Sequence, residues 1–145
     1  MSVRLLSLST ASPLGVVSSD RAVELLSRLA SAEVKPRVIE ALHRRTEIET
    51  RGSVIADGVG AQSFYQIDAE SRGPGTADRL SRYAEHARPL ALRAASDALV
   101  AAASRGVEAA DVTHLVTASC TGFDAPGVDQ YLIQELGLPR DVRRT

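Results

Sequence analysis

Cysteine, histidine and tryptophan are scarce in this sequence. Its 145 residues include one cysteine, three histidines and no tryptophan. A single cysteine excludes an internal disulfide and suits a reducing compartment, so a cytoplasmic location is expected. The scattered histidines do not combine with Cys120 into the spacing of zinc ligands, and no metal site is expected.

Aromatic residues and excess charge are also lacking. The chain has three Tyr and two Phe, and its formal net charge is −1. Without a basic cluster interleaved with aromatics, nucleic acid is not an expected partner. No stretch approaches the roughly 18 apolar residues of a membrane span, and "MSVRLLSLSTASPLG" is too interrupted by Ser and Thr for a signal peptide. The length and the 44% hydrophobic content fit one soluble globular domain.

Common nucleotide-binding and hydrolase motifs are absent from the sequence. It contains neither a G-x-x-x-x-G-K-[ST] loop nor a G-x-S-x-G elbow. The stretch "GVGAQS" is an incomplete G-x-G-x-x-G and does not join a strand to a helix. These absences exclude the best-known phosphate loops and serine nucleophiles.

The first half of the sequence alternates strand-like and helical patterns. Residues 3–8 form a short apolar run followed by turn residues, which predicts a strand. Ser18 or Ser19 is expected to cap a helix, and Pro36 to stand in the first turn of a second helix. Residues 52–75 are predicted to be irregular, with a short strand near 50–55.

A long helical pattern follows. A stripe of mostly small apolar residues runs through 76–105, which predicts a helix that packs closely against its neighbours. Pro89 interrupts this stripe, so a kink or two abutting helices are expected there. Gly106 is expected to end the helix.

The remaining sequence predicts a strand, a helix and the approach to another strand. Residues 112–118 have the pattern of a buried strand. Asp124 is expected to cap a helix with Pro126 in its first turn, and Gly137 to stop it. The whole order predicts an α/β fold in which helices cross over between parallel strands.

Cys120 is the first candidate for chemistry, in "TASCTGFDAPG". It stands between a predicted strand end and a helix start, where α/β proteins expose functional groups. It is a nucleophile, a residue that lines a pocket, or an inert core residue, and local evidence leaves these three open. No histidine is an evident general base, because His114 precedes Cys120 on the same predicted strand and the other two lie in helices.

The second candidate is the basic segment "HRRTEIETRG". Arg44, Arg45 and Arg51 can bind a phosphate, because guanidinium groups pair with phosphate oxygens bidentately. A solvated basic helix end is the other interpretation, and it also suits the helix dipole. The carboxylates of "TEIE", like that of Asp129, are interpreted as solvated surface groups.

The segment "THLVTASCTGFDAPGVDQYLIQELGLPRDVRR" resembles the type III polyketide synthases, the chalcone-synthase-like branch of the thiolase-fold condensing enzymes. The similarity is greatest to bacterial members. "GPGTADRLSRYAEHARPLALRAASDAL" resembles the long helix of the family, and "HRRTEIETRG" the segment after its early helices. The resemblance covers nearly the whole chain, so residues 1–145 are expected to form the N-terminal part of a thiolase-like α/β domain, with a mostly parallel sheet.

The resemblance implies decarboxylative condensation of malonyl-CoA units onto an acyl-CoA starter by a homodimer. Coenzyme A thioesters are then the substrates, and no further cofactor is expected. In the family a Cys nucleophile carries the acyl chain, while a His and an Asn bind the thioester carbonyl and the enolate.

Transferred residue by residue, the resemblance places three residues of this chain on the substrate pocket. Cys120 and Thr121 match positions on the pocket wall beside the nucleophile. Ala125 matches a residue that reaches from one subunit into the neighbour's cavity, and its small side chain implies a roomier cavity.

The resemblance also places a coenzyme A phosphate contact at Arg45, with Arg44 or Arg37 as a substitute contact. Two further basic positions of the family's cluster fall on Val38 and Ala41, which carry no charge. The phosphate site of this chain is therefore expected to be reduced.

The family's catalytic residues are not expected within this sequence. The nucleophilic Cys of the family follows "LGLPRDVRR" at the end of the next strand, and the His and Asn lie farther on, so residues 1–145 alone are predicted to be inactive. They would belong to a truncated, nicked or split enzyme that needs its C-terminal half. The alternatives are a non-catalytic module that binds coenzyme A or pairs with a second subunit, and a gene remnant.

Overall fold

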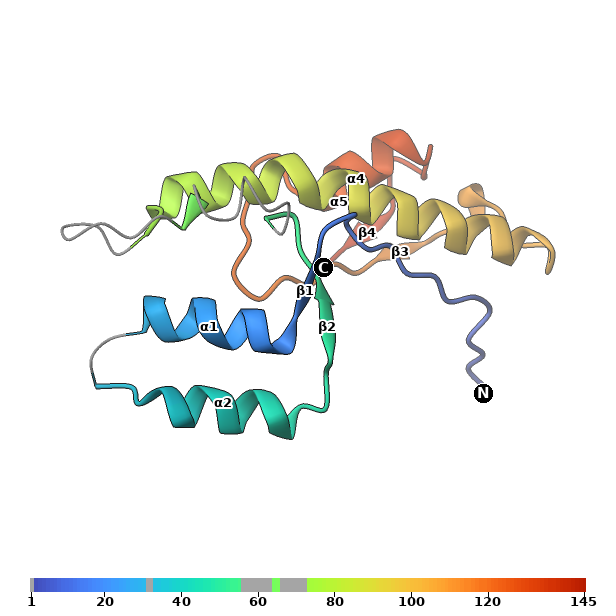
Figure 1. Cartoon of the computed structure of the whole chain (residues 1–145). Coiled ribbons are helices and arrows are strands. Elements are labelled where there is room, and N and C mark those ends of the chain that lie inside the picture. Colours follow the sequence, from blue (N-terminus) through green and yellow to red (C-terminus); the bar gives the residue numbers. More distant parts are fainter. Residues whose placement is uncertain (1, 31–32, 56–63, 66–72) are drawn as a thin grey trace. The chain divides into compact units, whose positions relative to one another are not determined.

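The computed structural model describes residues 2–30, 33–55, 64–65 and 73–145. The chain forms two compact units, Ser12–Thr76 and a second made of Met1–Ala11 with Ala77–Thr145 (Figure 1). Most of the irregular segment expected at 52–75 lies outside the described residues. Along the chain the elements are β1 (Val16–Ser18), α1 (Ser19–Leu29), α2 (Pro36–Arg45), β2 (Thr50–Gly52), α4 (Thr76–Ala103), the 3-10 helix η1 (Ala109–Asp111), β3 (His114–Leu115), α5 (Val128–Glu135) and β4 (Arg143–Arg144).

The first unit is a pair of helices joined to a short antiparallel strand pair. Strand β1 pairs with β2 so that Val16 faces Gly52 and Ser18 faces Thr50. The side chain of Ser18 accepts a hydrogen bond from the Arg21 N–H and caps α1, as expected. Pro36 occupies the first turn of α2, also as expected. Helices α1 and α2 lie side by side (Figure 1).

The expected strand at 3–8 is wrong. These residues have no regular secondary structure, and Val3 is 97% exposed. An isolated extended segment gains nothing from a β conformation unless a neighbouring backbone accepts and donates its hydrogen bonds. Residues 3–8 do have the apolar pattern of a strand. In the described part of the chain, however, no strand pairs with them.

Helix α4 is one continuous helix through Pro89, so the expectation of two abutting helices is wrong. At its end Gly106 has φ +77°, where a side chain would be strained. Its N–H donates to the Ala103 carbonyl at 3.0 Å, and the N–H of Val107 donates to the Ala102 carbonyl at 3.4 Å. These two bonds satisfy carbonyls that the helix end leaves open, and Gly106 ends the helix as expected.

Strands β3 and β4 are parallel and are joined through α5. His114 faces Arg143 and Leu115 faces Arg144 in this pair. The backbone pairing extends one step further, since the Thr117 N–H donates to the Thr145 carbonyl at 2.9 Å. A parallel pair needs a crossover connection, and α5 provides it. The expected α/β pattern is therefore confirmed here, although the strand predicted at 112–118 is shorter than expected.

Apolar side chains of this second unit are buried on α4, on α5 and between α5 and β4. Gly137, with φ +62°, ends α5 as expected, and the Leu138 N–H then donates to the Ile133 carbonyl. This turn directs the chain toward β4. The buried residues of the unit are Ala102, Leu132, Leu138 and Val142.

Candidate functional site

The candidate site is the loop of residues 119–127, which leaves β3 and leads into α5 (orange in Figure 1). Cys120 is an exposed free thiol, so the interpretation of it as an inert core residue is wrong. Thr121 and Ala125 are exposed on the same loop. Phe123, between them, is 71% exposed. The three residues expected on a pocket wall therefore lie together on one loop and face away from the core of their unit.

The first half of this loop lies against α4. The Gly122 N–H donates to Ser119 Oγ at 3.1 Å and closes a tight turn around Cys120 and Thr121. A Cβ atom at Gly122 would lie 2.1 Å from Cε2 of Tyr83. Only glycine allows this approach between the loop backbone and the Tyr83 ring.

The second half of the loop is bound by Arg88, which sequence reasoning missed. Arg88 Nη2 donates to Asp124 Oδ2 and, at 2.9 Å, to the Pro126 carbonyl. The Arg88 Cζ atom lies 5.9 Å from the centroid of the Tyr131 ring, within the range of a cation–π contact. The side chains of Arg88 and Asp124 are 31% and 18% exposed, so the ion pair is partly shielded from water.

The expected role of Asp124 as a helix cap is wrong. Helix α5 begins at Val128, its N-cap is Gly127, and no side chain caps it. Pro126 lies before the helix and not in its first turn. The Asp124 carboxylate instead accepts from Arg88 and from the Ala125 N–H. A signal was present in the sequence, because Arg88 lies next to the small apolar stripe of α4, between Ala84 and Ala91, and a charge that is partly buried there needs a partner.

Asp129 is also more than the solvated surface group that was expected. It is partly buried, and its Oδ2 atom accepts from Arg144 Nη1 at 3.2 Å. The same Arg144 nitrogen lies 3.2 Å from Gln130 Oε1. Arg144 thus ties β4 to the start of α5, directly after the candidate loop.

The basic segment lies at the end of α2, in the unit Ser12–Thr76. Arg44 pairs with Glu40 one turn earlier, and both side chains are exposed. Arg51 donates to Thr46 Oγ1 at 3.3 Å and lies 3.5 Å from His43 Nδ1, so it takes part in local structure. Arg45 is exposed, and within the described residues it makes no hydrogen bond or ion pair.

Of Arg44, Arg45 and Arg51, Arg45 alone makes no hydrogen bond or ion pair within the described residues. Exposed ion pairs such as that of Arg44 with Glu40 contribute at most about 1 kcal/mol, so Arg44 can also exchange its partner. Val38 and Ala41, the neutral positions of the basic cluster, are exposed on the same helix. Arg37, the other candidate substitute, is exposed near the helix start.

The described residues contain no group of three or more His, Cys, Asp and Glu side chains able to hold a metal ion. None of the helices in the described ranges has both the length and the apolar character needed to cross a membrane.

Comparison with known proteins identifies the family. Residues 2–145 match the model of the N-terminal domain of chalcone and stilbene synthases. The chain is 36% identical over 142 residues to the alpha-pyrone synthesis polyketide synthase-like Pks18 of Mycobacterium tuberculosis. That match covers 94% of this chain and 33% of Pks18, so the chain spans about a third of the length of this relative.

Solved structures show the same fold. The polyketide synthase PKS-I of the brown alga Ectocarpus siliculosus superposes with a TM-score of 0.67 at 27% identity, over 97% of this chain and 38% of that one. The structure of CsyB complexed with CoA-SH gives a TM-score of 0.71 at 26% identity, over 99% of this chain and 36% of that one. The fold is therefore the N-terminal part of the thiolase-like α/β fold, as the resemblance implied. The chain belongs to the chalcone and stilbene synthase family of type III polyketide synthases and corresponds to its N-terminal domain.

Proposed function

We propose that this chain supplies the N-terminal part of a type III polyketide synthase, an acyltransferase that condenses malonyl-CoA units onto an acyl-CoA starter. The observation that supports this most directly is the match of residues 2–145 to one domain of the family, with the "SCTGFDAPG" block on an exposed loop. In this proposal the thiolate that carries the growing chain comes from outside residues 1–145. The chain works as part of a cytoplasmic homodimer.

The role of the loop 119–127 in this enzyme is to form part of the acyl pocket. Cys120 and Thr121 would line the wall beside the nucleophile, and Ala125 would reach into the cavity of the neighbouring subunit. Their exposure supports this role, because a side chain that is buried within its own unit cannot face a substrate. The small Ala125 side chain leaves room for a long acyl chain.

The role of the end of α2 is to hold the phosphates of coenzyme A. Arg45 is exposed and makes no ion pair within the described residues, while Arg44 has only the exposed Glu40 as a partner. Guanidinium groups bind phosphate oxygens with two parallel hydrogen bonds, so Arg45 with Arg44 is a suitable cationic pair. The crystallised complex of CsyB with CoA-SH is consistent with a coenzyme A site in this family.

A second candidate function is a non-catalytic module that binds coenzyme A or pairs with another subunit. The exposed arginines at the end of α2 favour it, because they require no catalytic residue to bind a phosphate. Both functions predict coenzyme A binding. Only the first predicts that the loop 119–127 takes part in condensation when the rest of a synthase is present.

The purified chain of 145 residues provides the first test. We expect calorimetry to detect binding of coenzyme A, and mass spectrometry to detect no pyrone or resorcinol from acyl-CoA and malonyl-CoA. Product formation by this chain alone would contradict the proposal, since it would require a nucleophile among residues 1–145. Absence of any heat of binding would contradict the assignment of Arg45 and Arg44.

A further inference from the structure

We infer that Arg88 of α4 is a positioning residue for the candidate pocket loop, and that it sets which acyl chains the pocket accepts without touching them. The inference rests on the proposed function for its effect on substrates. Its structural part, the attachment of the loop 119–127 to α4, does not depend on that function.

The geometry points to Arg88 because a single nitrogen binds both neighbours of Ala125. Nη2 donates to the Asp124 carboxylate and to the Pro126 carbonyl, and Ala125 lies between these two residues. The Ala125 N–H donates to the other oxygen of the same carboxylate at 2.9 Å. The backbone at Ala125 is therefore held on both sides and through its own N–H.

One further contact helps to keep the Arg88 guanidinium in place. The Tyr131 ring contacts the guanidinium from α5, with 5.9 Å between Cζ and the ring centroid. A partly buried guanidinium that satisfies a carboxylate and a carbonyl costs more to remove than an exposed one, because its partners are then left unpaired.

A second attachment point completes the arrangement. Gly122 contacts the Tyr83 ring, and Tyr83 lies five residues before Arg88, about 7.5 Å along the same helix. Between and beside these two contacts, Cys120, Thr121 and Ala125 remain exposed. The contacts with α4 therefore fix the loop backbone, while the side chains proposed for the pocket stay available to a ligand.

The first test uses Cys120 as a reporter, since it is the only thiol in the chain. A nitroxide label on Cys120 is compared by electron paramagnetic resonance in the unaltered chain and in Arg88→Ala, Arg88→Lys and Asp124→Asn. We expect a several-fold shorter rotational correlation time in Arg88→Ala and Asp124→Asn, and an intermediate value in Arg88→Lys, which keeps the charge but not the planar fork.

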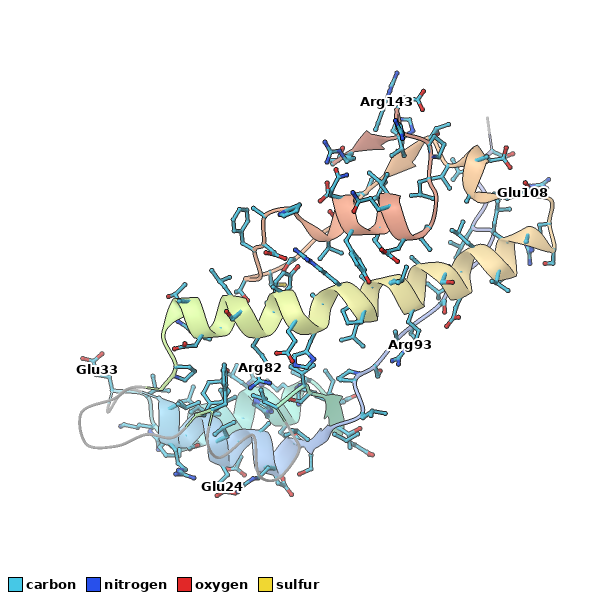
Figure 2. All side chains as sticks on the ribbon, turned by 90° about the horizontal axis from the view of Figure 1, so that it is seen from above. Glu24, Glu33, Arg82, Arg93, Glu108 and Arg143 are labelled. Carbon is cyan, nitrogen blue, oxygen red and sulfur yellow. The ribbon has the colours of Figure 1, made fainter. Side chains whose placement is uncertain are left out.

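The matched control is Arg93→Ala. Arg93 is an exposed arginine of the same helix, turned by about 140° from Arg88, and Figure 2 shows it on the side of α4 away from α5. Its substitution is expected to leave the label spectrum unchanged. Circular dichroism verifies that each variant keeps its helices. An unchanged spectrum in folded Arg88→Ala and Asp124→Asn would overturn the inference, whatever the function of the loop.

The second test concerns substrates and uses a hybrid synthase, in which residues 2–145 replace the matched third of mycobacterial Pks18. In this hybrid Arg88→Ala is expected to change the ratio of kcat/KM for long and short acyl-CoA starters several-fold, with partial recovery in Arg88→Lys. An unchanged ratio together with a mobile label would overturn the assigned role in acyl selection. A folded hybrid that makes no polyketide at all would instead contradict the proposed function. The label spectra would still show whether Arg88 holds the loop 119–127 against α4.

Discussion

At the scale of single residues, Gly122 of the candidate loop lies so close to Tyr83 that a Cβ atom there would stand 2.1 Å from the ring. A side chain at position 122 would collide with the Tyr83 ring, at a distance no real Cβ contact shows. We predict that Gly122→Ala lowers the free energy of unfolding by about 1–3 kcal/mol, because the ring or the loop has to move. Urea unfolding followed by circular dichroism measures this loss.

The control for this prediction is a double-mutant cycle with Tyr83→Leu, which removes the ring edge. In the Tyr83→Leu background, Gly122→Ala should lower the free energy of unfolding by clearly less than it does in the unaltered chain. Equal costs in both backgrounds would show that the collision with Tyr83 is not the cause.

Arg44 pairs with Glu40, whereas Arg45 has no partner within the described residues. This difference leads to a second prediction at the residue scale. Arg45→Ala is expected to weaken coenzyme A binding at least tenfold at low salt, since a hydrogen bond to a charged group is worth about 1.5–3 kcal/mol. Arg44→Ala is expected to weaken it less, because Arg44 is already paired with Glu40. Calorimetry measures both affinities.

Arg105 supplies the control for this pair. It is exposed after the end of α4, in the other unit of the chain, and Arg105→Ala removes the same charge without altering α2. Equal affinities of Arg45→Ala and Arg105→Ala for coenzyme A would contradict the assignment of Arg45.

Several single residues could be predicted from the sequence because their roles are local. The Ser18 cap and the glycines at positions 106 and 137 depend on neighbours within a few residues. The cap predicted at Asp124 is wrong because the partner of this carboxylate, Arg88, lies 36 residues away. Capping preferences consider only the backbone N–H groups close in sequence. The partly buried Arg88 guanidinium also binds the Asp124 carboxylate, and the sequence near Asp124 gives no sign of it.

At the scale of elements, the ends of α2 and α4 differ in which residue takes the left-handed conformation after the helix. Glu47, after α2, has φ +55°, a left-handed conformation that is unfavourable for most side chains. Gly106, after α4, has φ +77° and nothing within 4 Å of an added Cβ, so only its backbone conformation opposes a side chain.

Removing glycine at one helix end and introducing it at the other should change the free energy of unfolding in opposite directions. Gly106→Ala should lower the free energy of unfolding by about 1–2 kcal/mol, which is the cost of the left-handed conformation. Glu47→Gly should raise it by up to about 1 kcal/mol, because the same cost is relieved. Thermal and urea unfolding measure both, and a destabilised Glu47→Gly chain would contradict this account of the α2 end.

Helices were more predictable than strands in this chain. The patterns at 19–29 and 76–103 contain their own hydrogen-bond partners, so the sequence of each segment is sufficient. The sequence pattern does not indicate β1, and the strand it predicts over residues 3–8 is wrong. A strand depends on a partner that is distant in sequence, and β1 exists because β2 lies beside it.

At the scale of the whole molecule, few side chains of the described residues are buried and many of their large apolar side chains are exposed. In the unit that contains the candidate loop, the buried residues are Ala102, Leu132, Leu138 and Val142. Val3, Leu5, Leu8, Val116 and Phe123 of the same unit are all more than 70% exposed. Exposed apolar surface of this kind is typical of interaction sites and promotes association.

We therefore predict that the purified 145-residue chain binds a hydrophobic dye such as ANS and associates as its concentration rises. The same residues within the hybrid synthase should bind several-fold less dye per molecule, because the rest of the synthase covers part of this surface. Light scattering and dye fluorescence measure the two effects. A monomeric chain without dye binding would contradict the prediction.

The family could be identified from the sequence because the block "SCTGFDAPG" is specific, and the match over residues 2–145 confirms it. The identity of the acyl starter could not be predicted in the same way. Under the proposed function, the acyl cavity is shaped by the position of the loop 119–127. That position depends on Arg88 and Tyr83, which no local motif connects to the loop.

The most direct test of the central claim is product analysis of the hybrid synthase by mass spectrometry, with an acyl-CoA starter and malonyl-CoA. If residues 2–145 form a working N-terminal domain, the hybrid extends the starter, and Ala125→Met shifts the products toward shorter acyl chains because the cavity is narrowed. A folded hybrid that binds coenzyme A but never extends the starter would contradict the claim.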